Sequence, residues 1–268
     1  MRSILAPTCR PHMRVLFVSG EVAPFSETTE TARLMRTLPE ALEEHKGVEP
    51  RIMMPRYGVV SERKNRLHEV IRLSGDEISA GDASDTLKVK VASIPGIRLQ
   101  VYFMDSVAFF KRKGLWRDRK SEAAFEDNPA RALFYARAAL STVQKLGWGP
   151  EVVHAAGWIS AFVPHVLKAD FGDSDLFASA RSVYTPDRDP GFEPTLGEAE
   201  AESLGLPPGW AGRSLRSIGL ETADAVVYAD GDGAGDGEPA GPTLPSDGGP
   251  AADAAADVYG GLDKAKAA

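Results

Sequence analysis

The sequence predicts an α/β protein built on a Rossmann-like, doubly wound parallel sheet. As far as Tyr228, short apolar runs rich in β-branched residues alternate with longer amphipathic runs, which is the pattern of strands joined by helices. The first such unit is the clearest, because a continuous apolar run is followed by a loop and then by apolar residues at helical spacing. With 268 residues, of which 43% are hydrophobic, the chain can bury one substantial core. We therefore expect one domain followed by a tail.

The first unit places a ligand-type loop after a buried strand. Residues 14–19 are apolar almost throughout, as in a parallel strand covered on both faces. The loop that follows contains Glu21, Glu27 and Glu30 and no lysine. A helix comes next, with one apolar stripe formed by Leu34, Leu38, Ala41 and Leu42. Loops at this edge of an open α/β sheet hold ligands, and a helix N-terminus there favours anions, but these carboxylates disfavour phosphate.

The middle of the chain continues the alternation. Residues 50–55, bounded by prolines, predict a second parallel strand. Three segments with alternating apolar residues predict strands of an excursion around the main sheet, namely 67–73, 87–92 and 98–103. A helix is predicted from Asn128 to Leu146, because asparagine caps free amides, Pro129 tolerates the first helical position and Gly147 ends a helix.

The last elements complete the predicted domain over residues 13–228. Residues 152–155, 182–185 and 223–228 predict buried strands, and residues 159–168 predict a helix with Pro164 near its start. Beyond them, residues 229–257 are almost wholly Gly, Ala, Asp and Pro and predict a low-complexity disordered segment. Residues 258–268 regain apolar character and predict a short terminal helix.

Composition and termini exclude several classes of function. Residues 1–12 lack the apolar stretch of a secretion signal and are expected to be a disordered leader, with either Met1 or Met13 as the start. No run of 18 apolar residues predicts a membrane span. A net charge of −7 disfavours nucleic acid and anionic membranes as partners. The single Cys9 excludes an internal disulfide and a thiol zinc cluster, so we expect a cytoplasmic location, no metal and no cofactor.

Several blocks, taken in order, resemble the N-terminal domain of bacterial glycogen and starch synthases of the ADP-glucose type, which have the two-domain GT-B fold. The matching blocks are residues 14–19, 21–26, 38–42, 54–58, 101–105, 127–128, 131–146, 152–154 with Trp158, and 183–185. The run from Ser61 to Gly75 is similar to that of short single-domain members of the family. The resemblance implies transfer of glucose from ADP-glucose to an α-1,4-glucan with retention of configuration.

The chain departs from this family at three motifs. Where the family reads Ser-Lys-Thr-Gly-Gly-Leu, with a lysine that reaches the donor phosphates, this chain has Glu27 in place of the lysine and side chains in place of both glycines. The family block His-x-His-Asp-Trp-His keeps only His154 and Trp158, and Gly157 stands in place of its aspartate. The family block Thr-Val-His-Asn has Asp187 in place of a histidine that contacts the transferred glucose.

The family resemblance also implies a C-terminal donor-binding domain, for which the remainder after Tyr228 is too short. We therefore expect a degenerate active site without catalytic residues, and impaired transfer by this domain alone. A separate donor-domain polypeptide or an α-glucan is the expected partner. The alternative is a non-catalytic glucan-binding or regulatory interaction module.

The candidate substrate-binding residues are Glu27, His154, Trp158 and Asp187, and each has a plainer interpretation or a departure beside it. Glu27, with Glu30, also suits a helix start, where a carboxylate is stabilised by about 0.3–1 kcal/mol. If Glu27 and Glu30 lie at this helix N-terminus with no basic partner, the phosphate affinity should be negligible. His154 also suits a structural role, and Trp158 can stack on a sugar or anchor a loop.

Two clusters of basic residues have no role assigned by the motifs above. One comprises Arg51, Arg56, Arg63, Lys64 and Arg66, and the other comprises Lys111, Arg112, Lys113, Arg117, Arg119 and Lys120. Either can bind an anionic ligand or partner, but the interleaved acids favour a solvated face. The aromatic residues near the second cluster, Phe109, Phe110 and Trp116, show no recognisable stacking pattern, which leaves a nucleic-acid role a weak third option.

Overall fold

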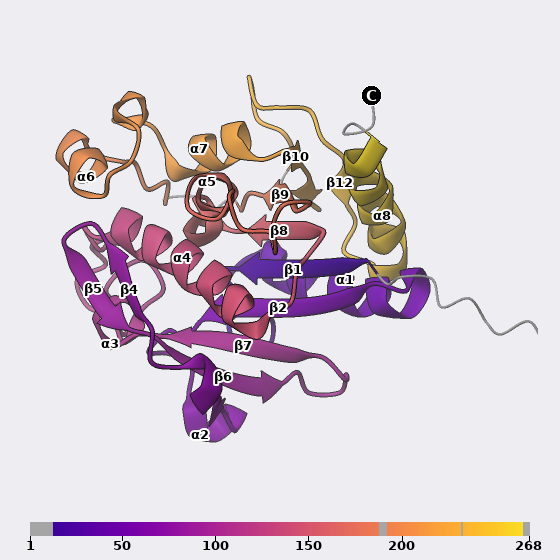
Figure 1. The fold of residues 1–268 in the computed structure, drawn as a ribbon, viewed down its shortest axis with the longest axis horizontal. Helices are drawn as coiled ribbons and strands as arrows, with labels where there is room; N and C mark the ends of the chain where they lie inside the picture. The colour runs from indigo at the N-terminus through magenta and orange to yellow at the C-terminus, as the bar shows by residue number, and fades with distance from the viewer. Residues whose placement is uncertain (1–12, 188–191, 232, 265–268) are drawn as a thin grey trace, which may run out of the picture.

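A computed structural model describes residues 13–187, 192–231 and 233–264 of the chain. The expected leader over residues 1–12 and the last four residues of the expected terminal helix lie outside the described residues. Figure 1 shows a central sheet with helices packed around it and the C-terminal segment running beside the first helix. The fold class predicted from the sequence, an α/β protein with a mostly parallel central sheet, is confirmed.

Eight strands form the central sheet of the described chain, in the order β10-β9-β8-β1-β2-β7-β6-β3. Their bounds are β1 Arg14–Ser19, β2 Glu49–Pro55, β3 His68–Glu69, β6 Lys88–Ser93, β7 Gln100–Asp105, β8 Val152–Ala156, β9 Arg181–Thr185 and β10 Ala225–Val226. The strands from β10 to β7 are parallel to their neighbours, whereas β6 and β3 pair antiparallel at one edge. The predicted excursion therefore extends the main sheet.

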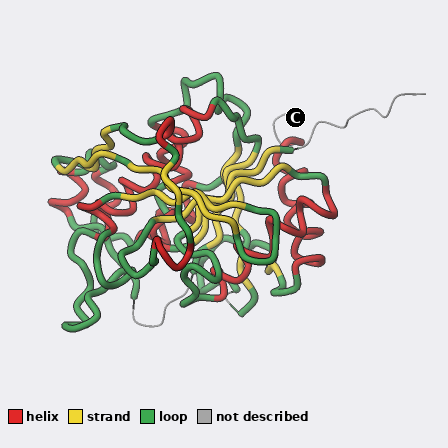
Figure 2. Tube along the Cα trace, turned by 90° about the horizontal axis from the view of Figure 1, so that it is seen from below, coloured by secondary structure: helices red, strands yellow, loops and turns green. Residues whose placement is uncertain are grey.

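Helices cover both faces of this twisted sheet (Figure 2). The chain steps from β1 to β2 through α1 (Glu30–Lys46), and it steps in the other direction from β7 to β8 through α4 (Asn128–Leu146). It continues from β8 to β9 through α5 (Val163–Ala169). Because crossovers between parallel strands are right-handed, α4 and α5 lie on the face opposite α1. The loops that follow the carboxyl ends of the parallel strands consequently lie together at one edge of the sheet.

The start and end of α1 are set by side-chain chemistry. The hydroxyl of Thr29 accepts a hydrogen bond from the backbone N–H of Ala32 at 3.3 Å, and Thr29 has extended backbone geometry. Glu30 lies in the first turn, where the helix dipole favours a carboxylate. Gly47 ends the helix at φ 63°, a conformation that glycine adopts without strain. The apolar stripe predicted from the sequence is buried.

The start of α4 differs in detail from the prediction. Asn128 is the first helical residue, and Asp127 occupies the cap position without a side-chain capping bond. The Asn128 side chain instead donates to the carbonyl of Trp116 and accepts from Arg131. Asn128 thus joins the helix to the preceding loop, and the predicted stop at Gly147 is present at φ 64°.

The excursion contains elements that the sequence pattern did not separate. Its described parts are the hairpin β4 (Glu77–Ala80) and β5 (Ala83–Thr86), the short helices α2 (Glu62–Asn65) and α3 (Val107–Phe110), and the 3-10 turn η1 (Ile71–Leu73). The predicted strand over 67–73 is reduced to β3 followed by η1. The hairpin packs against α4 and α3, so it covers one end of the sheet.

The structure differs from the expected disorder over residues 229–257. After α6 (Glu198–Ser203), the 3-10 turn η3 (Pro208–Trp210) and α7 (Leu215–Thr222), the short strands β11 (Tyr228–Ala229) and β12 (Thr243–Leu244) pair in parallel. A helix, α8, then runs from Gly248 to Lys264 and packs along α1. Alanines on the inner face of α8 allow this helix to approach α1 closely, and they are buried. The composition alone did not predict this burial.

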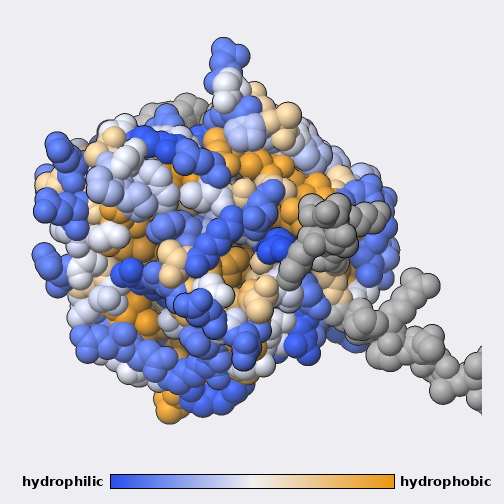
Figure 3. All heavy atoms as spheres, turned by 45° about the horizontal axis from the view of Figure 1, so that its top comes forward, coloured by the Kyte–Doolittle hydropathy of each residue, from blue (hydrophilic) through white to orange (hydrophobic). Residues whose placement is uncertain are grey.

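In the described residues no helix is long and apolar enough to cross a bilayer. Hydrophilic side chains cover most of the face seen in Figure 3, and hydrophobic residues show in the hollows between them.

Candidate ligand groove at the carboxyl edge of the sheet

Three adjoining hollows lie along the loops that follow the parallel strands, and we call them together the groove. The first, of about 570 Å³, is lined by Phe25, Ser26 and Thr28 after β1 and by residues 114–119 and others of the loop after α3. The second, of about 450 Å³, shares Trp116 with the first. The third, of about 290 Å³, shares Phe192 with the second. The groove therefore extends across the sheet edge, where ligands of α/β proteins bind.

An aromatic platform forms the centre of the groove. Trp116 and Phe192 stack with their ring centroids 4.0 Å apart and an interplanar angle of 14°. Trp158, from the 3-10 turn η2 (Trp158–Ser160) after β8, meets the ring of Phe192 edge-on at 5.2 Å. The guanidinium of Arg117 lies 4.7 Å from the ring of Trp116. Rings held in this way present rigid apolar surface with polar groups at the margin.

Buried polar contacts hold Trp116 in place. The amide of Asn128 donates to the carbonyl of Trp116 at 2.9 Å and accepts from the Nη1 group of Arg131 at 2.6 Å. Arg131 is fully buried and donates through Nε to the carbonyl of Phe109 at 2.8 Å. Burial lowers the pKa of Arg131 to about 10, which still leaves it a cation at neutral pH. Hydrogen bonds thus connect Trp116 to two buried side chains at the start of α4.

The loop after β1 satisfies its donors internally. The buried carboxylate of Glu21 accepts from the backbone N–H of Thr28 at 3.2 Å and from its hydroxyl at 2.6 Å. The hydroxyl of Ser26 also donates to this carboxylate. Because a carboxylate already occupies these donors, the loop has less capacity for a second anion.

Glu27 points away from this internal network and pairs with a cation. The Nε group of Arg33 donates to Glu27 at 2.7 Å, and its Nη1 group donates to Glu30 at 2.6 Å. Negligible phosphate affinity was predicted on the condition that these carboxylates have no basic partner, and this condition is not met. All three side chains are partly exposed, so the pairs contribute little to stability.

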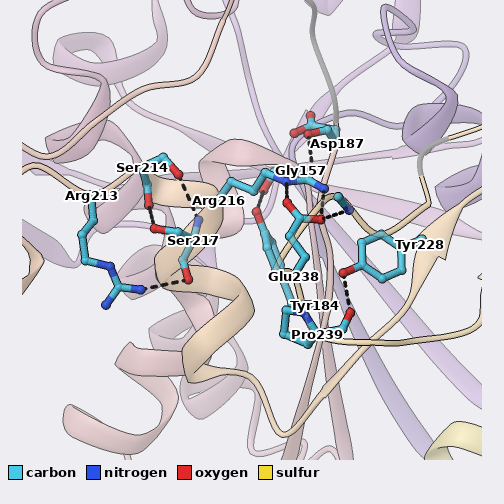
Figure 4. A network of polar contacts seen from close by, with 11 residues as sticks. Gly157, Tyr184, Asp187, Arg213, Ser214, Arg216, Ser217, Tyr228, Glu238 and Pro239 are labelled. Atoms are coloured by element: carbon cyan, nitrogen blue, oxygen red, sulfur yellow. Dashed lines mark hydrogen bonds and ion pairs between the residues drawn. The ribbon is translucent and has the colours of Figure 1, made fainter.

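Asp187 lies at the third hollow, beside Trp158, and faces Gly157 (Figure 4). Gly157 has φ 85°, and a Cβ atom built on it would lie 3.1 Å from the Oδ2 atom of Asp187. The carboxylate of Asp187, which follows β9, thus fills the space next to the end of β8. Arg216 in α7 donates through Nη1 to the carbonyl of Asp187 at 3.0 Å.

A largely buried ion pair closes the far wall of the same hollow. Arg216 binds the carboxylate of Glu238 through Nε at 2.6 Å and through Nη2 at 2.8 Å (Figure 4). Despite its burial, Arg216 keeps a raised pKa because Glu238 hydrogen bonds to it and attracts its charge. The segment between β11 and β12 therefore supplies part of the groove.

His154 lines none of these hollows and lies in contact with α8. One ring nitrogen is 2.7 Å from the hydroxyl of Tyr259, and the other is 2.7 Å from that of Thr185. The ring has no exposed surface. Burial lowers the pKa of His154 to about 3, so the ring is neutral at physiological pH. Both nitrogens are occupied within the chain.

Of the four candidate residues from the sequence, the structure brings together two. Trp158 and Asp187 line the same hollow. Glu27 is exposed beside the first hollow, and His154 is buried elsewhere. Sequence reasoning missed Phe192, Arg216 and Glu238, because they come from segments with no recognised motif and reach the groove only through tertiary folding. In the described part of the chain no cluster of three metal-ligating side chains is present.

Known proteins match the chain over most of this domain. The model of the starch synthase catalytic domain matches residues 14–186. The glycogen synthase of Chlorobium limicola is 39% identical over 176 residues, which are 66% of this chain and 36% of that protein. The glycogen synthase of Chlorobaculum parvum is 33% identical over 224 residues, which are 81% of this chain and 46% of that protein. The chain thus spans less than half the length of these curated relatives.

The fold is also that of a solved structure. The catalytic domain of starch synthase IV from Arabidopsis thaliana, bound to ADP and acarbose, superposes with a TM-score of 0.64 and 20% sequence identity. The match covers 81% of this chain and 44% of that one, and at this identity it shows the fold alone. Taken with the sequence matches, it leads to one conclusion: this chain belongs to the starch synthase catalytic domain family.

Proposed function

We propose that this chain is a glycogen/starch synthase-like domain that binds an α-glucan in the groove and does not transfer glucose on its own. The observation that carries the proposal is the platform of Trp116, Phe192 and Trp158 along the groove. Rigid aromatic faces with carboxylates and a guanidinium nearby suit a polyol, which offers apolar C–H faces and many hydroxyls. The acarbose in the related starch synthase IV structure supports a sugar ligand for this family.

Impaired transfer is proposed from the donor side of the groove. The family resemblance places a phosphate-binding lysine where this chain has Glu27, and Glu21 already takes the donors of the loop. A carboxylate within about 4 Å of a phosphate costs roughly 1–4 kcal/mol when not compensated. Here Arg33 offsets part of that charge but is bound to two carboxylates. Such a loop stabilises a leaving diphosphate poorly.

Glucan binding is tested by titrating the purified chain with maltoheptaose and measuring the dissociation constant by calorimetry. Trp116→Ala should weaken binding by about tenfold or more, because it removes a stacking face worth on the order of 1.5 kcal/mol. The matched control is Tyr102→Ala, because Tyr102 is a partly exposed aromatic residue on β7 outside the groove. No measurable glucan binding, or an equal loss in both variants, would contradict the proposal.

Transfer is tested separately with ADP-glucose and a glucan primer, with released ADP as the readout. We expect no turnover by the chain alone. Robust turnover that disappears in Glu27→Ala would overturn the impaired-domain proposal and make Glu27 part of a working site.

A second candidate function is that of a subunit completed by a separate donor-domain polypeptide. It is favoured by the donor side of the groove, where Glu21 takes the donors of the loop and Arg33 is bound to Glu27 and Glu30, because contacts to a diphosphate would then have to come from another polypeptide. Adding the isolated C-terminal half of the Chlorobium limicola enzyme should then restore ADP release. Continued inactivity of the mixture, with glucan binding intact, would favour the binding module.

A further inference from the structure

A positively charged hollow of about 520 Å³ lies beside the groove. Its lining comprises Arg112, Lys113, Asp118, Arg119, Lys120 and Phe125. It shares Asp118 and Arg119 with the first hollow of the groove and Phe125 with the second. The second basic cluster of the sequence therefore does more than cover a solvated face, because several of its members surround one concave space.

The acids near this hollow are already engaged. Asp127 binds Arg112 through both carboxylate oxygens at 2.5 Å. Asp118 accepts the backbone N–H groups of Ser121 and Lys120, each at 2.9 Å, and these bonds lower its pKa. Asp118 is thus a turn-forming carboxylate, and Arg112 is neutralised by its partner.

The other cations around the hollow remain uncompensated. Among the ion pairs of the described chain, none involves Lys113, Arg119 or Lys120. With Asp118 counted against these three, the lining has a positive balance in a protein whose net charge is −7. Concentrated positive charge along a concave wall attracts anions more strongly than the same charges spread over a convex surface.

Two guanidinium groups lie near the ring of Phe125, and in the described chain only that of Arg112 is paired with a carboxylate. The Cζ atom of Arg112 is 4.9 Å from the ring centroid, and that of Arg131 is 5.1 Å from it. Arg131 makes no ion pair among the described residues, and its Nη2 group is buried without a hydrogen-bond partner. A buried cation without a paired carboxylate leaves positive potential in the low-dielectric wall behind the hollow.

We propose that this hollow binds the phosphoryl group of a sugar phosphate or a nucleotide. Lysine and arginine side chains are the usual ligands of phosphate oxygens, and three of them converge here. The volume exceeds what a phosphoryl group needs, so the rest of the ligand would extend over Phe125 or through Arg119 into the groove. This site is separate from the carboxylate-rich loop after β1, and the inference does not rest on glucan binding.

The test is an NMR titration of the full chain with inorganic phosphate, glucose 6-phosphate, ADP and neutral maltotriose. The three phosphates should shift the backbone amides of residues 113–120, and the affinity should fall as salt rises from about 0.05 to 0.5 M. Tighter binding of glucose 6-phosphate or of ADP identifies the ligand body, and equal affinities identify the phosphoryl group alone. The absence of saturable shifts with all three phosphates would overturn the inference.

Site specificity is tested with the triple variant K113S/R119S/K120S. Loss of three exposed cations worth about 0.2–1 kcal/mol each should weaken phosphate binding by several-fold up to about a hundredfold. The control, R63S/K64S/R72S, removes three exposed cations that line none of these hollows and changes the net charge equally. Equal weakening by both variants would mean long-range attraction without a site. The double variant K113S/K120S keeps Arg119, which also lines the first hollow of the groove, and its maltotriose binding should be unchanged. That result separates the phosphate site from the glucan proposal.

Discussion

The imidazole of His154 in β8 and the hydroxyl of Tyr259 in α8 are hydrogen bonded at 2.7 Å across the interface between the sheet and the C-terminal helix. Both side chains are buried, and the rings meet at a steep interplanar angle of 82°. This bond links the terminal helix, which was predicted from residue 258 onward, to the centre of the sheet.

Removal of this hydroxyl should destabilise the domain. In Tyr259→Phe, the ring nitrogen of His154 is left buried without a partner, which costs about 1–3 kcal/mol. Urea unfolding followed by circular dichroism measures the change. Tyr102→Phe is the matched control, because its hydroxyl contacts Arg51 at a partly exposed position. Equal stability of both variants would show that α8 does not depend on this bond.

Stability should fall as the pH is lowered through the ordinary range of histidine. Burial lowers the pKa of His154 to about 3, against about 6.5 in the unfolded chain, so the unfolded state binds more protons between these values. The free energy of unfolding should therefore decrease by up to about 1.4 kcal/mol per pH unit below pH 6.5. Urea unfolding at pH 7.5, 6.0 and 5.0 measures the slope.

A substitution assigns this slope to one residue. His154→Gln should be less stable at pH 7.5 but should show a shallower decline with pH. His165 is partly buried, and this burial lowers its pKa, so it contributes in the same direction. It is only partly enclosed, and His165→Gln should retain most of the slope. A slope that survives His154→Gln unchanged would assign the pH dependence to other groups.

Gly157 and Asp187 should be energetically coupled. A side chain at residue 157 must adopt φ 85° and contact the Asp187 carboxylate, so Gly157→Ala should cost about 1–3 kcal/mol. Gly157→Asp should cost more, because it adds a second carboxylate at the same place. In the Asp187→Asn background, the extra cost of the aspartate over alanine should shrink. A double-mutant cycle from urea unfolding measures this coupling, and strict additivity would contradict it.

Arg216 and Glu238 should also be coupled, through their paired hydrogen bonds. Loss of one partner of a largely buried pair leaves the other charge uncompensated, so Glu238→Gln and Arg216→Met should each destabilise by about 1–4 kcal/mol. The double variant should lose less than the sum of the two. The exposed pair of Arg213 and Glu221 is the control and should show a coupling below about 1 kcal/mol.

Local sequence signals predicted the core of the fold well. The strand, loop and helix at the start of the chain follow from apolar periodicity and capping chemistry, and β2, β8 and β9 fall where short apolar runs predicted them. A terminal helix was predicted only from residue 258, and the first part of α8 did not follow from composition, because a segment rich in glycine and alanine has little apolar surface per residue to bury. Ala251, Ala252 and Ala255 are nevertheless fully buried, since α1 supplies the other half of the interface.

The candidate groove was less accessible from the sequence than the fold. Trp158 and Asp187 follow strand ends, which is a local signal. Phe192 and Glu238 carry none, because only the folded chain brings them to the same hollow. The partner of Glu27 was similarly hidden, although Arg33 follows at a spacing that one helical turn and a loop can bridge.

The packing of α8 against α1 sets an order for folding. The helix α1 follows the first strand, whereas its partner α8 lies at the far end of the described chain. The contact between them therefore has a very large sequence separation. During synthesis, the side of α1 that packs against α8 stays exposed to solvent until nearly the whole described chain has left the ribosome. Chaperone dependence and sensitivity to C-terminal truncation should therefore be properties of this domain that its compact core alone would not suggest.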